Sequence, residues 1–197
     1  MRRLLLVRHG ETSWNATGKL QGQEDIPLSE KGLEQSKSLR PFLGRYTISN
    51  VVSSDLQRAY QTAQALGFET ARLEPRLREA KLGVWEGVEK SHLRKTSCED
   101  YIAWREGRFT PEGGESFQHL CERLKTVVNE LPNTDETTLL VTHGGVVRAA
   151  LASLLNIQPS MIIPAGPASL TVISLDGKPR LEHYNLTAYT LPDDGAV

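Results

Sequence analysis

Two histidines in this sequence share one local setting, a short apolar run just before them and a glycine directly after. His9 follows LLLV at residues 4–7 with one arginine between, and His143 follows LLV at residues 139–141 with one threonine between. Apolar runs of this length indicate buried strands. Because ligands of parallel sheets bind beyond the carboxyl ends of the strands, we expect both imidazoles at one edge of a sheet.

Two arginines accompany these histidines. Arg8 adjoins His9, and Arg58 lies in the first turn of a helix predicted after an apolar strand at residues 51–52. Guanidinium groups present planar forks of N–H donors that fit phosphate oxygens. A histidine whose Nδ1–H is held by a backbone carbonyl presents a neutral, nucleophilic Nε2. We therefore expect His9 to take a phosphoryl group, while Arg8, Arg58 and a protonated His143 neutralise the phosphate oxygens.

The alcohol that leaves in such a reaction needs a proton from a carboxylic acid. Glu79, in the segment LREAKLG at residues 77–83, is the loop carboxylate we expect to supply it. Metal ions commonly neutralise the phosphate in phosphoryl transfer, but the arginines and histidine can do so here. We expect no metal ion and no other cofactor, because neither the histidines nor the two cysteines have metal-ligand spacing.

Strands alternate with helices along the chain, which predicts an α/β fold with a mostly parallel sheet covered on both faces. A polar loop is predicted at residues 10–27, and Ser54 with Gln57 forms a capping-box pattern before the Arg58 helix. The tail from Leu191 is expected to fray. The predicted strands are at residues 4–7, 51–52, 139–141, 170–175 and 181–184, and the predicted helices follow Ser29, Ser54, Ser116 and Gly145.

Length and composition limit the possible partners. A chain of 197 residues with 39% apolar composition predicts one domain, 1–197. The formal charge of -1 gives no basic field for nucleic acid or an anionic membrane surface. The apolar runs are too short for a signal peptide or a membrane span, so we expect a cytoplasmic protein. Exposed apolar residues of the cap or of the last strands could support a homodimer.

The segment at residues 83–114 is the best candidate for an inserted cap over the sheet edge. It holds Trp85, Trp104, several charges and further glycines. The two tryptophans could stack on a sugar or could lie buried beneath the cap, and Arg78 or Arg105 could meet a carboxylate.

The motif RHGET at residues 8–12, with Asn15 after it, resembles the signature of the histidine phosphatase superfamily, which includes cofactor-dependent phosphoglycerate mutases and many small phosphatases. The resemblance covers nearly the whole chain. Its further motifs are QG at 21–22, PLS at 27–29, SSDL with RA at 53–59, LRE at 77–79, WEG at 85–87, GGES at 113–116 and THGG at 142–145.

This resemblance implies a three-layer α/β/α sandwich of the phosphoglycerate mutase-like kind. It also implies roles for the matching residues, with His9 as the phosphorylated nucleophile and Glu79 as the proton donor. Arg8, Arg58 and His143 would form the phosphate pocket. Asn15, Gln21 and Gly22 would line it, and the backbone N–H of Gly144 would face the phosphate.

The resemblance favours hydrolysis over isomerisation. Mutases of this family carry a long insertion with a basic pair between the acid and the second histidine, whereas this chain has a shorter segment without an Arg-Arg pair there. The motifs are most similar to the branch that acts on glucosyl-3-phosphoglycerate. Phosphatases of α-ribazole phosphate or of many sugar phosphates share several of them. A non-catalytic phosphate-binding module is disfavoured, because every residue with a chemical role is present.

Overall fold

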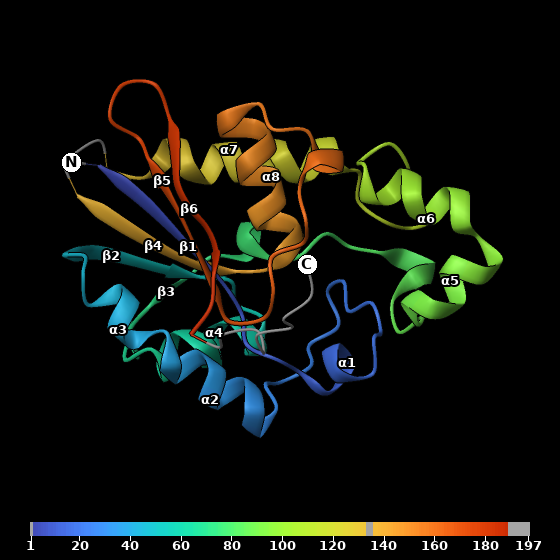
Figure 1. Cartoon of the computed structure of the whole chain (residues 1–197), viewed down its shortest axis with the longest axis horizontal. Helices are drawn as coiled ribbons and strands as arrows, with labels where there is room; N and C mark the ends of the chain where they lie inside the picture. Colours follow the sequence, from blue (N-terminus) through green and yellow to red (C-terminus); the bar gives the residue numbers. More distant parts are fainter. Residues whose placement is uncertain (1, 133–135, 189–197) are drawn as a thin grey trace, which may run out of the picture.

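A six-stranded sheet in the order β3-β2-β4-β1-β5-β6 forms the centre of this computed structural model, which describes residues 2–132 and 136–188 (Figure 1). Neighbouring strands from β3 to β1 pair in parallel, whereas β5 pairs antiparallel with β1 and with β6. The mostly parallel sheet is therefore confirmed. The strands are β1 (Arg3–Arg8), β2 (Ile48–Ser53), β3 (Arg72–Leu73), β4 (Thr137–Thr142), β5 (Ser169–Ser174) and β6 (Arg180–Leu186).

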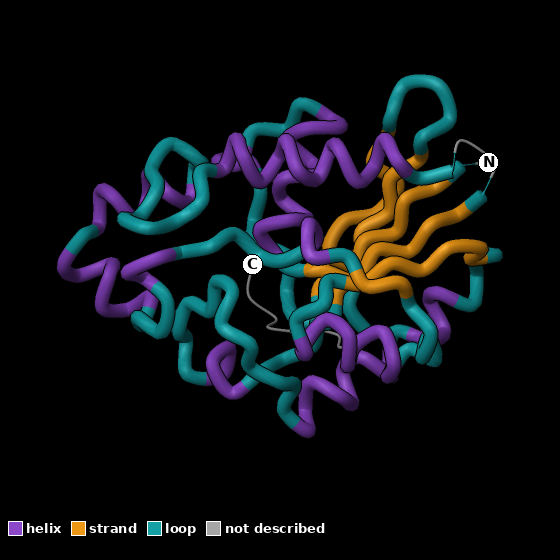
Figure 2. Tube along the Cα trace, turned by 180° about the vertical axis from the view of Figure 1, so that it is seen from behind, coloured by secondary structure: helices purple, strands orange, loops and turns teal. Residues whose placement is uncertain are grey.

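Helices cover both faces of the sheet, as the predicted three-layer sandwich requires (Figure 2). Side chains alternate along a strand, so Leu4 and Leu6 of β1 pack in one apolar cluster and Leu5 and Val7 in another. The first cluster includes residues of α7 (Phe117–Glu130) and α8 (Gly144–Leu155). The second includes residues of α3 (Arg40–Leu43) and α4 (Gln57–Ala65), beside which lies α2 (Glu30–Ser38).

Two of the predicted helix starts have the expected caps. The Ser29 hydroxyl accepts from the N–H of Gly32 at the start of α2, and the Ser116 hydroxyl accepts from the N–H of His119 at the start of α7. Each bond satisfies one of the N–H groups that a helix leaves without an internal partner.

The capping box predicted for α4 is wrong. The N-cap position is Leu56, whose side chain offers no acceptor, and Asp25 Oδ1 accepts from the N–H of Gln57 at 2.7 Å instead. The Ser54 hydroxyl lies 2.9 Å from Nε2 of His143. The start of α4 is therefore tied to the loop at residues 10–27. That loop also contains the four-residue helix α1 (Ser13–Ala16), which was not predicted; Thr12 and Asn15 cap it reciprocally.

Residues 83–114, here called the cap segment, lie away from the sheet, at the right of Figure 1. They contain the short 3-10 helix η2 (Gly83–Trp85) and the helices α5 (Lys90–Thr96) and α6 (Cys98–Arg105). The segment has its own apolar cluster, in which Trp85, Leu93 and Tyr101 pack with Leu20 of the 10–27 loop. Trp104 and Phe109 pack against this cluster.

The two ends of the cap segment meet at Gly83. Its φ of +55° is in the left-handed region, and a Cβ atom there would lie 1.9 Å from the carbonyl oxygen of Glu112. Both observations require glycine at this position. The segment thus leaves and rejoins the main body through one tight contact.

We expect Gly83→Ala to destabilise the fold more than Gly177→Ala does. Both glycines have positive φ, which costs alanine about 1 kcal/mol, but a Cβ atom at Gly177 has no heavy atom within 4 Å. The clash with the Glu112 carbonyl should add about 2 kcal/mol for Gly83→Ala alone. Urea unfolding of both variants measures the difference, and equal losses of stability would contradict the tight contact.

Candidate active site

His9 lies directly beyond β1, and its ring is held by the backbone. Its Nδ1 is 2.7 Å from the carbonyl oxygen of Gly10, which can only accept a hydrogen bond, so Nδ1 carries the proton. Nε2 is therefore the basic nitrogen, as expected for a nucleophile. The side chain is buried, and burial together with the charges of Arg58 and Arg8 holds the pKa of His9 well below its usual value.

Arg58 lies in the first turn of α4 and is fully buried. Its guanidinium donates to the carbonyl oxygens of Glu24 at 2.6 Å and Gly22 at 2.8 Å, and its Nε donates to Nδ1 of His143 at 3.2 Å. Burial is the main cause that lowers the pKa of Arg58 to about 10. The hydrogen-bond acceptors of this guanidinium are thus neutral carbonyl groups rather than a carboxylate. Because no carboxylate pairs directly with it, its positive charge can still attract an anion.

His143 follows β4 and lies behind Arg58. Because Nδ1 accepts from Arg58, the ring proton is on Nε2, which donates to the Ser54 hydroxyl at 2.9 Å. Burial and the charge of Arg58 keep the pKa of His143 well below its usual value. That a bound phosphate keeps His143 protonated on its oxygens stays a prediction. In this structure Nδ1 of His143 accepts from Arg58, and His143 is not among the described residues that line the cavity.

Arg8 ends β1 and supplies a second guanidinium. One of its terminal nitrogens donates to the carbonyl oxygen of Ala165, and its buried Nε forms no hydrogen bond with any residue in the described ranges. Burial lowers the pKa of Arg8, while the charge of Glu79 acts in the opposite direction. The unused Nε–H is a donor available to a ligand oxygen.

Glu79 stands in the irregular loop between the 3-10 helix η1 (Pro75–Leu77) and η2. Its Oε2 accepts from the N–H of Gly145 at the start of α8, and its Oε1 accepts from the N–H of Ala80, both at 2.9 Å. A Cβ atom at residue 145 would lie 2.1 Å from Oε1 and would displace the carboxylate from this position. The second glycine of the THGG motif therefore makes room for the acid.

One cavity at the carboxyl edge of the sheet brings together every predicted site residue except His143. The residues that line it include Arg8, His9, Asn15, Gln21, Gly22, Arg58, Glu79 and Gly144. Oε1 of Gln21 is buried in this wall and has no partner among the described residues. No group of three histidine, cysteine or acidic side chains in the described ranges is arranged to hold a metal ion.

Three further cations, here called the cationic wall, line this cavity, and of these the sequence analysis named only Arg105. Lys90 of α5 and Arg148 of α8 line it together with Arg105 of α6, and burial lowers the pKa of both Lys90 and Arg148. Within the described residues, none of the three forms an ion pair. The sequence did contain one indication that Arg148 lies near the site, because it follows Gly144 by one helical turn and so lies on the same face of the helix.

The aromatic residues of the cap segment divide between its core and the cavity. Trp85 is buried against Phe109 with ring centroids 5.5 Å apart, whereas Trp104 lines the cavity. The Arg148 guanidinium lies 5.7 Å from the ring of Trp104. Arg78 pairs with both carboxylate oxygens of Asp55 and does not line the cavity.

The fold and this site define an α/β protein in which two guanidiniums and a histidine with a basic Nε2 line one cavity. The family model of the histidine phosphatase superfamily (branch 1) matches residues 4–187. The chain belongs to this superfamily, as the resemblance of its motifs indicated. No helix in the described ranges combines the length and apolar character needed to cross a bilayer.

Similar proteins and solved structures indicate which enzymes of this superfamily the chain resembles. Glucosyl-3-phosphoglycerate phosphatase of Mycobacterium tuberculosis (strain CDC 1551 / Oshkosh) is 38% identical over 191 residues, which span 88% of this chain and 85% of that protein. Phosphoglycerate mutase-like protein 4 of Arabidopsis thaliana is 38% identical over 156 residues, 74% of this chain and 68% of that protein. A mycobacterial glucosyl-3-phosphoglycerate phosphatase solved with VO3 superposes with a TM-score of 0.84 at 35% identity, covering 94% of this chain and 99% of that one. The chain is a phosphatase of this superfamily.

We expect the fold to lose stability as the pH falls from 7.5 to 5.5. The pKa values of His9 and His143 in the folded chain lie well below the ordinary 6.5. The unfolded chain therefore takes up protons over this interval while the folded chain does not. Each histidine should then lower the free energy of unfolding by about 1.4 kcal/mol, which urea unfolding at the two pH values measures.

Two variants serve as controls for this loss. His143→Asn should show about half of the wild-type pH effect, whereas His92→Asn, which removes an exposed histidine of α5, should show all of it. If the free energy of unfolding of the wild type is equal at both pH values, the conclusion that His9 and His143 stay neutral in the folded chain is wrong.

Proposed function

We propose that this phosphatase hydrolyses a small phosphorylated metabolite through a phosphohistidine at His9, without a metal ion. Nε2 of His9 attacks phosphorus in line as the bond from phosphorus to the leaving alcohol oxygen breaks, and Glu79 gives that oxygen its proton. Water then attacks the phosphohistidine, Glu79 takes up a proton from the water, and inorganic phosphate leaves with His9 restored. The observation that carries this proposal is the orientation of His9, whose Nδ1–H is held by Gly10.

Electrostatic stabilisation in this mechanism comes from two guanidiniums. Arg8 and Arg58 line the same cavity as His9. Arg58 is fully buried and Arg8 partly buried, and neither forms an ion pair with a carboxylate within the described residues. Buried cations attract a phosphate more strongly than exposed ones, because little water screens them. They take the part that metal ions have in other phosphoryl transfers.

The cationic wall of the cavity supports a substrate with a second anionic group. Lys90, Arg105 and Arg148 stand there without carboxylate partners in the described ranges, beside the ring of Trp104. Glucosyl-3-phosphoglycerate carries a carboxylate and a sugar as well as the phosphate, so it suits this wall. We propose it as the substrate, with residues 83–114 as the cap that selects it. α-Ribazole phosphate and simple sugar phosphates lack the carboxylate.

The nucleophile is tested with His9→Ala. We expect turnover of p-nitrophenyl phosphate to fall at least 1,000-fold, because no other group can accept the phosphoryl group (~4 kcal/mol of lost transition-state stabilisation). Wild type should keep its rate in EDTA, and His92→Ala should match wild type. Residual hydrolysis within tenfold of wild type would exclude covalent catalysis by His9, and a rate lost in EDTA and restored by magnesium would exclude metal independence.

The substrate is tested with a panel in which phosphate release and phosphoglycerate isomerisation are both measured. We expect glucosyl-3-phosphoglycerate to exceed 3-phosphoglycerate, phosphoserine, α-ribazole phosphate and glucose 6-phosphate in kcat/KM. Arg105→Met should lower kcat/KM for the carboxylate-bearing substrates about tenfold or more beyond its effect on glucose 6-phosphate, since a hydrogen bond between charged groups contributes ~1.5–3 kcal/mol. Arg108→Met, which removes an exposed arginine paired with Glu106, is the matched control.

Three outcomes of this panel would contradict the proposal. A flat profile would indicate a phosphatase of broad specificity. A preference for α-ribazole phosphate would remove the role of the cationic wall, and isomerisation without phosphate release would indicate a mutase.

A further inference from the structure

The loop that carries Glu79 is irregular, so its backbone polar groups need partners from elsewhere. Between η1 and η2, residues 78–82 belong to no helix or strand. A buried carbonyl that lacks a donor is costly, and a loop held by few contacts samples several conformations. The elements that satisfy these carbonyls therefore decide where the Glu79 carboxylate lies.

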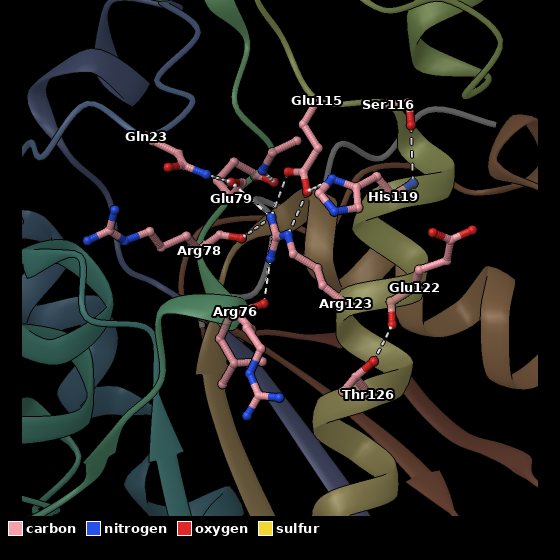
Figure 3. A network of polar contacts seen from close by, with 12 residues as sticks. Gln23, Arg76, Arg78, Glu79, Glu115, Ser116, His119, Glu122, Arg123 and Thr126 are labelled. Carbon is pink, nitrogen blue, oxygen red and sulfur yellow. Dashed lines mark hydrogen bonds and ion pairs between the residues drawn. The ribbon is translucent and has the colours of Figure 1, made fainter.

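A single guanidinium binds the two carbonyls at and before the acid and one in the adjoining η1. Arg123, in the middle of α7, donates to the carbonyl oxygens of Arg78 at 2.7 Å and Glu79 at 3.1 Å, and its other terminal nitrogen donates to the carbonyl oxygen of Arg76 (Figure 3). The side chain is only 13% exposed. Arg123 thus binds the backbone at Glu79 itself and at two residues just before it, Arg76 and Arg78.

Glu115 fixes the guanidinium in turn. Its two carboxylate oxygens accept from Nε and a terminal nitrogen of Arg123 at 2.7 and 2.9 Å, and its own N–H donates to the carbonyl oxygen of Lys81 at 2.8 Å (Figure 3). Such a bidentate pair holds a guanidinium in one plane. Gln23 adds a further donor to the Glu79 carbonyl at 3.1 Å.

We propose that Arg123, oriented by Glu115, is a positioning residue for proton transfer by Glu79. The guanidinium holds the backbone of the acid, while the N–H groups of Gly145 and Ala80 hold its carboxylate. Proton transfer requires the acid within hydrogen-bond reach of the leaving oxygen, so a small displacement of this loop slows that step. This inference rests on the proposed role of Glu79 as proton donor.

Substrates with different leaving groups can distinguish two roles of Arg123, which are positioning of the Glu79 carboxylate and general support of the fold. An alkyl phosphate such as 3-phosphoglycerate expels a basic alkoxide that needs a proton, whereas p-nitrophenyl phosphate expels a weakly basic phenolate that needs little help. Misplacing Glu79 should therefore slow phosphoenzyme formation from the alkyl phosphate far more than from p-nitrophenyl phosphate. A general loss of packing or of phosphate binding slows both.

The experiment measures the first turnover by rapid quench, with phosphoenzyme formation followed for both substrates. The variants are Arg123→Lys, which keeps the charge but loses the planar fork, and Glu115→Gln, which keeps the shape but loses the carboxylate. Arg76→Met is the matched control, because that side chain lies in the adjoining η1 and forms ion pairs with Glu74 and Glu130. Glu79→Gln serves as the reference for loss of the acid itself.

We expect both Arg123→Lys and Glu115→Gln to lower the alkyl-to-aryl rate ratio at least tenfold, in the same direction as Glu79→Gln, and Arg76→Met to keep the wild-type ratio. If Glu79→Gln lowers the ratio and the other two keep it within twofold of wild type, the positioning role is excluded. If Glu79→Gln itself leaves the ratio unchanged, the proposed proton donor is wrong and the positioning role falls with it. Phosphoenzyme formation from p-nitrophenyl phosphate shows in each case whether the variant is folded.

Discussion

The parallel pairing of β1 with β4 is the constraint on which the rest of the site depends. The two strands pair residue by residue up to Arg8 and Thr142, and the N–H of His9 donates to the carbonyl oxygen of Thr142 at 2.9 Å. The two histidines therefore emerge side by side, with ring centroids 5.2 Å apart. Both strands are buried on both faces, so a shift of β1 by one residue would turn every leucine toward the wrong helix layer.

Charges of opposite sign share the pocket without neutralising each other. The carboxylate of Glu79 is satisfied by backbone N–H groups, and the guanidinium of Arg58 mainly by backbone carbonyl groups. Had the acid and the arginines paired directly, the cations would offer less to a phosphate and the acid less to a leaving group. Backbone dipoles keep the two functions apart within one cavity.

The loops around the pocket are held by arginines from the core elements. Each of these guanidiniums donates to backbone carbonyl oxygens of a segment distant in the sequence, in a loop or at a short helix beside the pocket. The contacts run from Arg8 to residue 165, from Arg58 to residues 22 and 24, from Arg123 to residues 76, 78 and 79, and from Arg148 to residue 105. Five donors in one rigid plane suit arginine to this task, since it can bind two or three carbonyls at once. Side chains of the helices and strands thus help to fix these segments around the pocket.

Much of this arrangement is local and was predictable from the sequence. The apolar runs before His9 and His143, the serine caps of α2 and α7 and the position of Arg58 in a first helical turn depend on residues a few positions apart. Periodicity and capping chemistry therefore reveal them. The tertiary structure decided what depends on distant partners: Asp25 rather than Ser54 caps α4, Nδ1 of His143 accepts from Arg58, and Arg123 holds the acid loop. No local pattern encodes those contacts, because hydrogen bonds and burial are set by which segments the sheet brings together, and only the folded chain specifies that.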